Sequence, residues 1–404
     1  MSLPKSEIKR IIEKAIGEEN GILRLEPAWV ARVFLPPGRR LGLQGDQYLV
    51  GERGSICERW LASTTDAENP ISVPDEGQSF LKLRGGERIR LKDAVAVAGE
   101  MIMGEEYART HNCLGRLAKI FDYADRLPFH FHQMEHHARL VGSNSKEEAY
   151  YFPEDVDLGP SPETFFGVHP YISQEKKYDI LLPYLIEWKD DAILQHSRAF
   201  KQIPDDGFHV PAGILHAPGS ALTIEFQEDS DVYSFMQAKA GGKIISKELL
   251  FKDVTPEKRK KLGERAILEM IDWEVCGDPY FYENRHTPPL LIAESVKENC
   301  AEYWIYYNTR KFSGKKLIVH PGKKYISREN GVYNILIWRG KGKFGELEVE
   351  GGNFDLDELF VCHDRAVNGI EIENNSNKDL ILFKFFGPDI NTDVPMLKPY
   401  KQGG

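Results

Sequence analysis

Short strand-like segments recur at regular spacing in two stretches of this 404-residue sequence, and they constrain the fold more than any other feature. The later stretch begins near Tyr303 and contains YWIYYNT, KLIVH, NILIWRG, LEVEG, ELFVC, IEIEN and LILFKFFG. Gly, Asn and Asp separate these segments, as in the turns of a barrel or sandwich. The earlier stretch, residues 127–237, contains LPFHFHQ, EAYYF, GFHVPAG and ALTIEFQ. The pattern predicts a mainly β protein built from two β modules.

Helical patterns interrupt the two β stretches at defined places. Residues 173–200 carry apolar side chains at helical spacing, which predicts a helical insertion in the first module. Residues 255–273 begin with Thr-Pro, a good N-cap and first-turn pair, and predict a helical connector. The length also favours more than one domain. We therefore expect a partly helical N-terminal segment contributing strands to the first barrel, that barrel, a helical connector and a second barrel, at residues 1–125, 126–250, 251–300 and 301–404.

Charge and composition narrow the class of protein. Lys and Arg total 52 against 62 Asp and Glu, and this acidic balance without a basic stripe argues against nucleic-acid binding. No apolar run reaches the length of a membrane span, and the N-terminus lacks the apolar core of a signal peptide. The five scattered cysteines, without a CxxC pair, favour a reducing compartment. We expect a cytoplasmic protein that binds neither membrane nor nucleic acid, as a monomer or a homodimer.

Four of the twelve histidines lie in FHFHQMEHH, residues 129–137. On a strand, residues two apart point to the same side, so His130 and His132 would project into one space. Neutral imidazoles placed in this way are good ligands for zinc and neighbouring divalent metals, although a polar strand face has the same pattern. His136 and His137 are expected just past the strand, in an exposed turn or a supporting role.

Two later segments supply further metal-ligand types. Glu148 begins the aromatic segment EAYYF, and His216 follows the tight Pro-Ala-Gly turn of GFHVPAGILHAPG. The order HxH, Glu, PxGxxH resembles the metal site of cupins, which are small Greek-key β-barrels that hold one metal. Three imidazoles and one carboxylate leave coordination positions open for a substrate. The set predicts a metal-binding cupin barrel, followed by a second, metal-free one.

Longer segments resemble one particular group of cupins, the type I phosphomannose isomerases. KIFDYADRLPFHFHQ, SKEEAYYF, HVPAGILHAPG and EFQEDSD resemble motifs of that family, and GERGSICERWLAST resembles its early Glu-x-Trp segment. The gap between His132 and Glu148 is longer than in compact cupins, which agrees with this family. The resemblance covers roughly residues 45–240 by motif. The later β module resembles the family's second barrel only in its position along the sequence and in its strand-rich pattern.

The resemblance implies a metal-dependent aldose–ketose isomerase that acts on a sugar or sugar phosphate through an enediol intermediate. Zinc is the first expectation for the one divalent ion, with manganese, iron, cobalt and nickel as alternatives. The implied metal ligands are His130, His132, Glu148 and His216. The resemblance also implies catalytic roles for Lys146 and Asp231. From the residues alone, a surface lysine and a turn aspartate are open interpretations of these two positions.

Three residues are candidates for substrate binding: Glu58, Trp60 and His209. Sugars stack on aromatic rings, which suits Trp60, although a core tryptophan fits the pattern equally well. His209 lies in the strand-like FHV and is expected to be packed in the core or to line the pocket.

Two positions depart from the family pattern. His130 stands where the family usually has Gln, and Phe235 stands at or near the place of an arginine that follows Ser-Asp. A phosphorylated substrate would therefore need its cation elsewhere, or the substrate is an unphosphorylated sugar. An iron cupin dioxygenase and a non-catalytic sugar-binding cupin are the alternatives to the isomerase.

Overall fold

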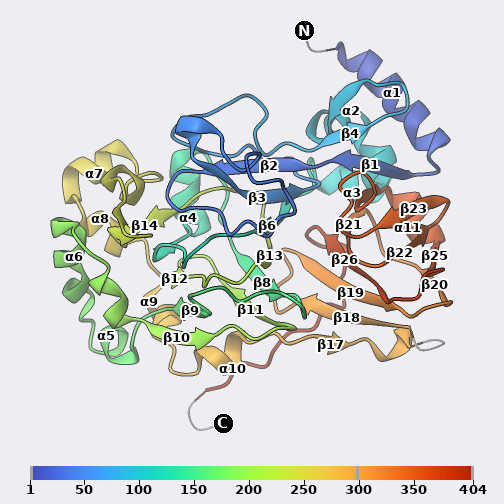
Figure 1. Ribbon diagram of the computed structural model, residues 1–404. Coiled ribbons are helices and arrows are strands. Elements are labelled where there is room, and N and C mark those ends of the chain that lie inside the picture. The colour runs from blue at the N-terminus through green and yellow to red at the C-terminus, as the bar shows by residue number, and fades with distance from the viewer. Residues whose placement is uncertain (1–2, 297–299, 402–404) are drawn as a thin grey trace.

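The computed structural model describes residues 3–296 and 300–401 (Figure 1). Antiparallel sheets dominate these residues, with sheets of nine, six, five, four and two strands, so the expected mainly β fold is confirmed. Short helices gather at one side of the molecule, on the left in Figure 1, and α1 to α3 lie beside the C-terminal strands on the other side.

Two sheets that face each other form the first module. The six-stranded sheet has the order β11-β8-β13-β6-β3-β2, and the five-stranded sheet has the order β10-β9-β12-β7-β14. One apolar cluster takes Phe121 and Tyr150 from the first sheet and Phe131 and Phe166 from the second, which shows that the core lies between them. The strands are β2 (Ala28–Arg32), β3 (Ser55–Leu61), β6 (Arg116–Phe121), β7 (His130–Phe131), β8 (Glu148–Phe152), β9 (Glu163–Phe166), β10 (Arg198–Lys201), β11 (Asp206–Val210), β12 (His216–Ala217), β13 (Thr223–Glu228) and β14 (Ser234–Phe235).

The second module contains a nine-stranded sheet and a four-stranded sheet. Their orders are β17-β18-β19-β26-β21-β24-β1-β4-β5 and β20-β25-β22-β23. A small β15-β16 hairpin leads into the connector. The strands are β1 (Ile22–Glu26), β4 (Phe80–Lys82), β5 (Arg88–Arg90), β15 (Lys239–Ala240), β16 (Lys243–Ile244), β17 (Leu290–Leu291), β18 (Ala301–Tyr306), β19 (Ser313–Val319), β20 (Lys324–Ser327), β21 (Tyr333–Arg339), β22 (Lys341–Phe344), β23 (Leu347–Glu350), β24 (Glu358–Val361), β25 (Ile370–Glu373) and β26 (Leu380–Phe386).

The N-terminal segment supplies strands to both modules. Strands β2, β3 and β6 join the first module, whereas β1 pairs with β24 of the C-terminal region, with Ile22 opposite Val361. Pro27 separates β1 from β2. Proline has no amide hydrogen for a ladder, so the chain leaves one sheet at this point and enters the other.

Helices form where the sequence predicts them, although the insertion is broken into short pieces. The amphipathic N-terminal helix α1 buries Ile8 and Ile12, and α7 begins with a Thr255 side chain that accepts the Lys258 amide hydrogen at 3.3 Å. In the insertion, Pro183 lies in the first turn of α6, where it starts a new helix instead of continuing the preceding turn. The α-helices are α1 (Lys5–Glu18), α2 (Leu91–Met103), α3 (Glu105–Thr110), α4 (Glu135–Ala138), α5 (Pro170–Gln174), α6 (Leu182–Glu187), α7 (Pro256–Leu262), α8 (Arg265–Leu268), α9 (Trp273–Cys276), α10 (Phe281–Arg285) and α11 (His363–Asn368).

Single-turn 3₁₀ helices complete the secondary structure of the described residues. Two of them, η3 and η4, belong to the insertion. They are η1 (Gly51–Arg53), η2 (Arg139–Val141), η3 (Tyr178–Leu181), η4 (Ala192–His196), η5 (Lys247–Leu250) and η6 (Ala293–Ser295).

A buried ion cluster occupies the interior of the second module. Lys384 on β26 is fully buried, and its ammonium donates to Glu302 and, at 2.6 Å, to Glu329. The Lys315 ammonium also donates to Glu329, at 2.7 Å. Such a cluster is stable only when every charge has a partner. Here the carboxylates and ammonium groups satisfy one another.

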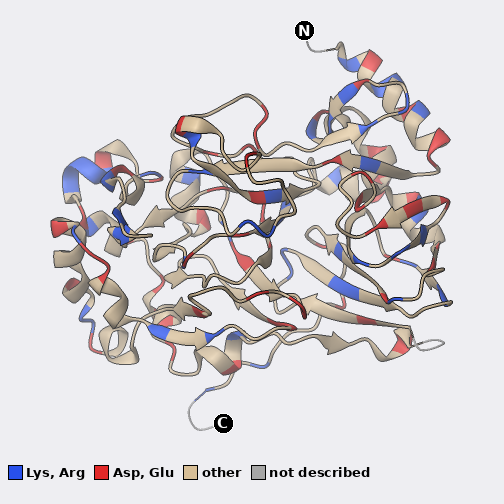
Figure 2. Cartoon of the chain, viewed as in Figure 1, with Lys and Arg blue, Asp and Glu red and all other residues tan. Residues whose placement is uncertain are grey.

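The surface carries both signs of charge. Basic and acidic residues interleave over most elements, with a local concentration of basic residues on α7 (Figure 2). Within residues 3–296 and 300–401, no helix combines the length and apolarity that crossing a membrane would require.

Candidate metal centre and active site

Three histidines converge between the two sheets of the first module. His130 on β7 and His216 on β12 are direct register partners, and His132, two residues after His130, follows β7 directly. The ring centroids of His130 and His216 lie 4.1 Å apart, and the His132 centroid lies 5.0 Å from each of them. All three side chains are buried, and one nitrogen from each lies within 4.8 Å of the others.

Glu148 faces the histidines from the opposite sheet, as the first residue of β8. Its Oε2 lies 2.9 Å from His132 Nε2, and its Oε1 lies 3.1 Å from His216 Nε2. The Tyr150 hydroxyl, two residues along the same strand and therefore on the same face, donates to Glu148 Oε1. The four side chains expected as ligands are thus brought together.

Backbone carbonyls orient the three rings. The Nδ1–H groups of His130, His132 and His216 donate to the carbonyl oxygens of Pro128, Val232 and Ile214 at 2.6, 2.7 and 2.9 Å. With Nδ1 protonated, each Nε2 of a neutral ring carries its lone pair toward the cluster, although the Lys146 ammonium lies 2.9 Å from that of His132. His216 Nε2 is buried and has no hydrogen-bond partner. The donor set and this orphaned nitrogen fit a divalent metal, because ligating histidines are commonly fixed through their other nitrogen.

Burial keeps the rings in the form that binds metal. Burial, followed by the charge of Lys146, lowers the pKa of His132 to about 3. Burial also lowers the pKa of His130 well below its ordinary value, and the neighbouring histidines reinforce this effect. His130 and His132 are therefore unprotonated at neutral pH, as metal binding requires.

A row of alternating basic and acidic side chains runs along the six-stranded sheet from the histidine cluster. The Lys146 ammonium lies 2.9 Å from Glu148 Oε2 and also 2.9 Å from His132 Nε2. It lies 3.4 Å from Glu225 Oε1, which in turn is 3.2 Å from the Lys119 ammonium. Burial, together with the charge of Glu148, raises the pKa of Glu225 to about 7.

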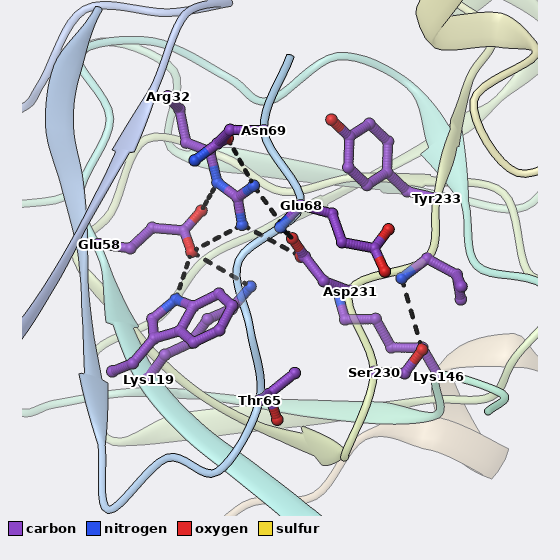
Figure 3. A network of polar contacts seen from close by, with 12 residues as sticks. Arg32, Glu58, Thr65, Glu68, Asn69, Lys119, Lys146, Ser230, Asp231 and Tyr233 are labelled. Atoms are coloured by element: carbon purple, nitrogen blue, oxygen red, sulfur yellow. Dashed lines mark hydrogen bonds and ion pairs between the residues drawn. The ribbon is translucent and has the colours of Figure 1, made fainter. Parts of the chain in front are cut away.

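This row of charged side chains ends at Arg32, beside Asp231 (Figure 3). Lys119 lies 3.7 Å from Glu58 Oε2, and the Arg32 Nε donates to Glu58 Oε1 at 3.0 Å. Arg32 also donates to both oxygens of Asp231, at 3.1 and 3.2 Å. Burial disfavours the charge on Glu58, yet Arg32 and Lys119 hold the pKa of this carboxyl below its usual range. Arg32 has the same effect on the pKa of Asp231.

A pocket opens onto this network, and aromatic rings form part of its wall. The residues that line it are Arg32, Phe34, Glu58, Lys119, Tyr123, Leu127, His130, His132, Lys146, Glu148, Tyr150, Pro218, Glu225, Asp231, Tyr233 and Phe235. Phe235, at or near the position of the family's arginine, contacts Phe34 and His130 edge-on with centroids 5.1 and 5.7 Å apart. Lys146, Asp231 and Glu58, singled out from the sequence, all reach the pocket.

Four other residues singled out from the sequence lie away from the pocket wall. Trp60 is fully buried, and its Nε1 donates to Glu58 Oε2 at 2.7 Å. The His209 Nε2 is 2.9 Å from Glu147, whose side chain lies outside the pocket lining. His136 and His137 lie on the short helix α4, past the strand.

Three charged pocket residues escaped the sequence reasoning: Arg32, Lys119 and Glu225. The latter two had a detectable signal, because each is a charge flanked by apolar residues inside a strand segment, in LAKIF and TIEFQ. Lys119 even stands in a quoted motif, where it received no role. Arg32 ends β2 and carried no such signal.

Comparisons with known proteins find similarity in structure only. No protein-family model matches the sequence, and no curated protein matches it either. The mannose 6-phosphate isomerase from Bacillus subtilis has a TM-score of 0.59 and 15% identity, covering 90% of this chain and 99% of its own. A phosphomannose isomerase variant from Salmonella typhimurium has a TM-score of 0.61 and 13% identity, covering 91% and 100%. A mannose 6-phosphate isomerase bound with zinc and yttrium has a TM-score of 0.60 and 13% identity, covering 91% and 100%. The expected likeness to phosphomannose isomerases is confirmed at the level of the fold.

Proposed function

We propose that this protein is a metal-dependent aldose–ketose isomerase that acts on a sugar or sugar phosphate through an enediol intermediate. The observation that carries the proposal is the convergence of three Nε2 atoms and the Glu148 carboxylate beside the Lys146 ammonium. The fold shared with mannose 6-phosphate isomerases supports it.

The metal would be held by His130, His132, His216 and Glu148. Imidazole and carboxylate ligands suit zinc, which is our first assignment, and a mannose 6-phosphate isomerase of the same fold is described as bound with zinc. A bound divalent ion supplies Lewis-acid polarisation of the carbonyl and hydroxyl oxygens between which the proton moves.

Lys146 and Asp231 are the residues to which we assign catalytic roles. Isomerisation moves a proton between adjacent carbons and places negative charge on oxygen, so a cation beside the reacting atoms lowers the barrier. Lys146 is buried next to the ligands and meets this need. Asp231 accepts two hydrogen bonds from Arg32 and one from the Glu68 amide, at 2.9 Å. A carboxylate offers about four acceptor sites, which leaves one to orient a substrate hydroxyl.

An iron-dependent oxygenase is the second candidate, because the same three imidazoles and carboxylate also suit iron and oxygen. The row of lysines and carboxylates beside the cluster favours proton transfer instead. A sugar-binding protein that catalyses no reaction is the third candidate, since a fold does not determine a function.

Metal analysis combined with activity assays separates these candidates. The purified protein is analysed for bound metals and then assayed with mannose 6-phosphate, fructose 6-phosphate, free mannose, lyxose and fructose. We expect bound zinc or another divalent ion and interconversion of at least one aldose–ketose pair. Bound iron with oxygen consumption and no isomerisation would refute the proposal in favour of an oxygenase. Sugar binding without any turnover would favour the non-catalytic alternative.

A further inference from the structure

Every hydrogen-bond donor of the pocket arginine already has a protein acceptor. A guanidinium has five N–H groups, and Arg32 uses one at Nε and two at each terminal nitrogen. The Nε and one Nη2 hydrogen go to Glu58 at 3.0 and 3.3 Å, and Asp231 takes two more at 3.1 and 3.2 Å. The fifth goes from Nη1 to Asn69 Oδ1 at 3.1 Å. Arg32 therefore has no donor left for the oxygens of a bound anion (Figure 3).

The other two cations of the pocket also lie beside carboxylates. Lys119 lies between Glu58 and Glu225, at 3.7 and 3.2 Å, and Lys146 lies between Glu148 and Glu225, at 2.9 and 3.4 Å. Among the lining residues, three basic side chains face four carboxylates. A divalent metal bound at the histidines would add positive charge only at the end of the pocket where the carbonyl reacts.

The pocket offers aromatic rings in place of a free cation. Phe34, Tyr123, Tyr233 and Phe235 line the pocket near Arg32, and Phe34 stacks on Tyr123 with centroids 5.7 Å apart. Aromatic rings suit the apolar faces of a sugar ring. A phosphate monoester, which carries a charge of about −1.5 to −2 at pH 7, would meet no unpaired cation there.

A second hollow, on the other side of Asp231, is acidic. Asp66, Glu68 and Asp229 line it together with Asp231, against the single cation Lys92. The Lys92 ammonium is already paired with Asp66 at 3.0 Å. An anionic group that extended past Asp231 would therefore meet carboxylates, which repel it.

We propose that the site takes an uncharged aldose or ketose and discriminates against the phosphate ester of the same sugar. The proposal rests on the isomerase function proposed above and assigns its substrate class. In an aldose 6-phosphate the phosphate lies at the far end of the carbon chain from the carbonyl. With the carbonyl at the histidine cluster, that phosphate would lie beside Arg32, whose N–H groups all have protein acceptors, and beside the aromatic rings.

The test compares free and phosphorylated sugars on the metal-loaded full-length protein. Isomerisation of mannose and lyxose is measured beside that of mannose 6-phosphate, with inorganic phosphate as a competitor. We expect kcat/KM for a free sugar to exceed that for mannose 6-phosphate by at least about tenfold, and millimolar phosphate not to inhibit. A preference for mannose 6-phosphate, or competitive inhibition by phosphate, would overturn the inference and leave the isomerase function standing.

A binding measurement separates failure of the inference from failure of the isomerase proposal. If no sugar is isomerised, the proposed function fails, and calorimetric titration with mannose and with inorganic phosphate still tests the charge argument. Mannose binding without phosphate binding supports it, and phosphate binding in the pocket contradicts it.

A variant of Asn69 tests directly whether Arg32 rejects phosphate because all of its N–H groups are already bonded. Asn69→Ala releases one Arg32 N–H without removing a charge, so the kcat/KM ratio of mannose 6-phosphate to mannose should rise severalfold. Asn144→Ala is the matched control, because the Asn144 side chain donates to the Asp229 carbonyl at 3.3 Å and has no bond to Arg32. An unchanged ratio in Asn69→Ala, or an equal rise in both variants, would count against the role assigned to Arg32.

Discussion

Replacing Arg32 with methionine should destabilise the protein strongly, because it removes the shared cation of two buried carboxylates, Glu58 and Asp231. The Arg32, Glu58 and Asp231 side chains are each only 3–4% exposed. Removing one partner of a buried ion pair costs about 3–5 kcal/mol. Glu58 keeps Lys119 at 3.7 Å, whereas Asp231 keeps only the Glu68 amide among the contacts of its carboxylate, so most of the loss should come from Asp231.

Equilibrium unfolding of the metal-free protein by guanidinium chloride measures this loss of stability. Arg109→Met is the control, because the Arg109 and Glu105 side chains are 66% and 75% exposed. An exposed pair contributes at most about 1 kcal/mol. Asp231→Asn in the Arg32→Met background should restore part of the stability, since it removes the unpaired charge. A loss in Arg32→Met no larger than that in Arg109→Met, or no recovery in the double variant, would refute the reasoning.

Three further predictions concern the metal, the second module and the contact between the modules. His216→Ala should lose the bound metal while His137→Ala keeps it, as elemental analysis will show, and equal loss in both would mean that the ligands are wrongly assigned. Lys384→Met should lower the free energy of unfolding by about 3–5 kcal/mol, because two buried carboxylates lose their shared ammonium, and metal content should stay unchanged. Burial, against the opposing charge of Arg59, raises the pKa of Glu358 to about 7, so the folded state holds a proton that the unfolded state releases above its ordinary pKa near 4.5. Its contribution to stability therefore falls as pH rises from about 4.5 to 7, by up to about 3 kcal/mol, and Glu358→Gln should remove this pH dependence from unfolding curves.

The histidine cluster could be predicted from the sequence because each of its segments has a local signature and because their order resembles the metal site of cupins, although its assembly depends on the pairing of β12 with β7. The HxH pair, the glutamate that opens an aromatic strand and the histidine after a tight turn each carry their geometry within a few residues. The same holds for the Thr255 cap and for helix α1, which follow from local backbone chemistry.

The Arg32 network could not be predicted, because it depends on how distant strands pair. Glu225 faces Lys119 through the register of β13 on β6, and Glu58 joins through the pairing of β3 with β6. Register is set by long-range burial and turn geometry, which a single sequence reveals only weakly. Pro183 was a local signal, and it explains why the predicted helical insertion forms as short helices.

The split between β1 and β2 has a consequence for synthesis of the chain. Strand β1 leaves the ribosome early but finds its partner, β24, only after more than three hundred further residues have been made. Until then the edge of β1 that pairs with β24 stays open, even if β4 has paired with the other edge, and unpaired edges attract other chains. Completion of the second module is therefore expected to be a late and slow step, since contacts of such long sequence separation fold slowly. A fragment that begins at residue 301 would lack β1, β4 and β5 and expose β24, so we expect it to aggregate when expressed alone.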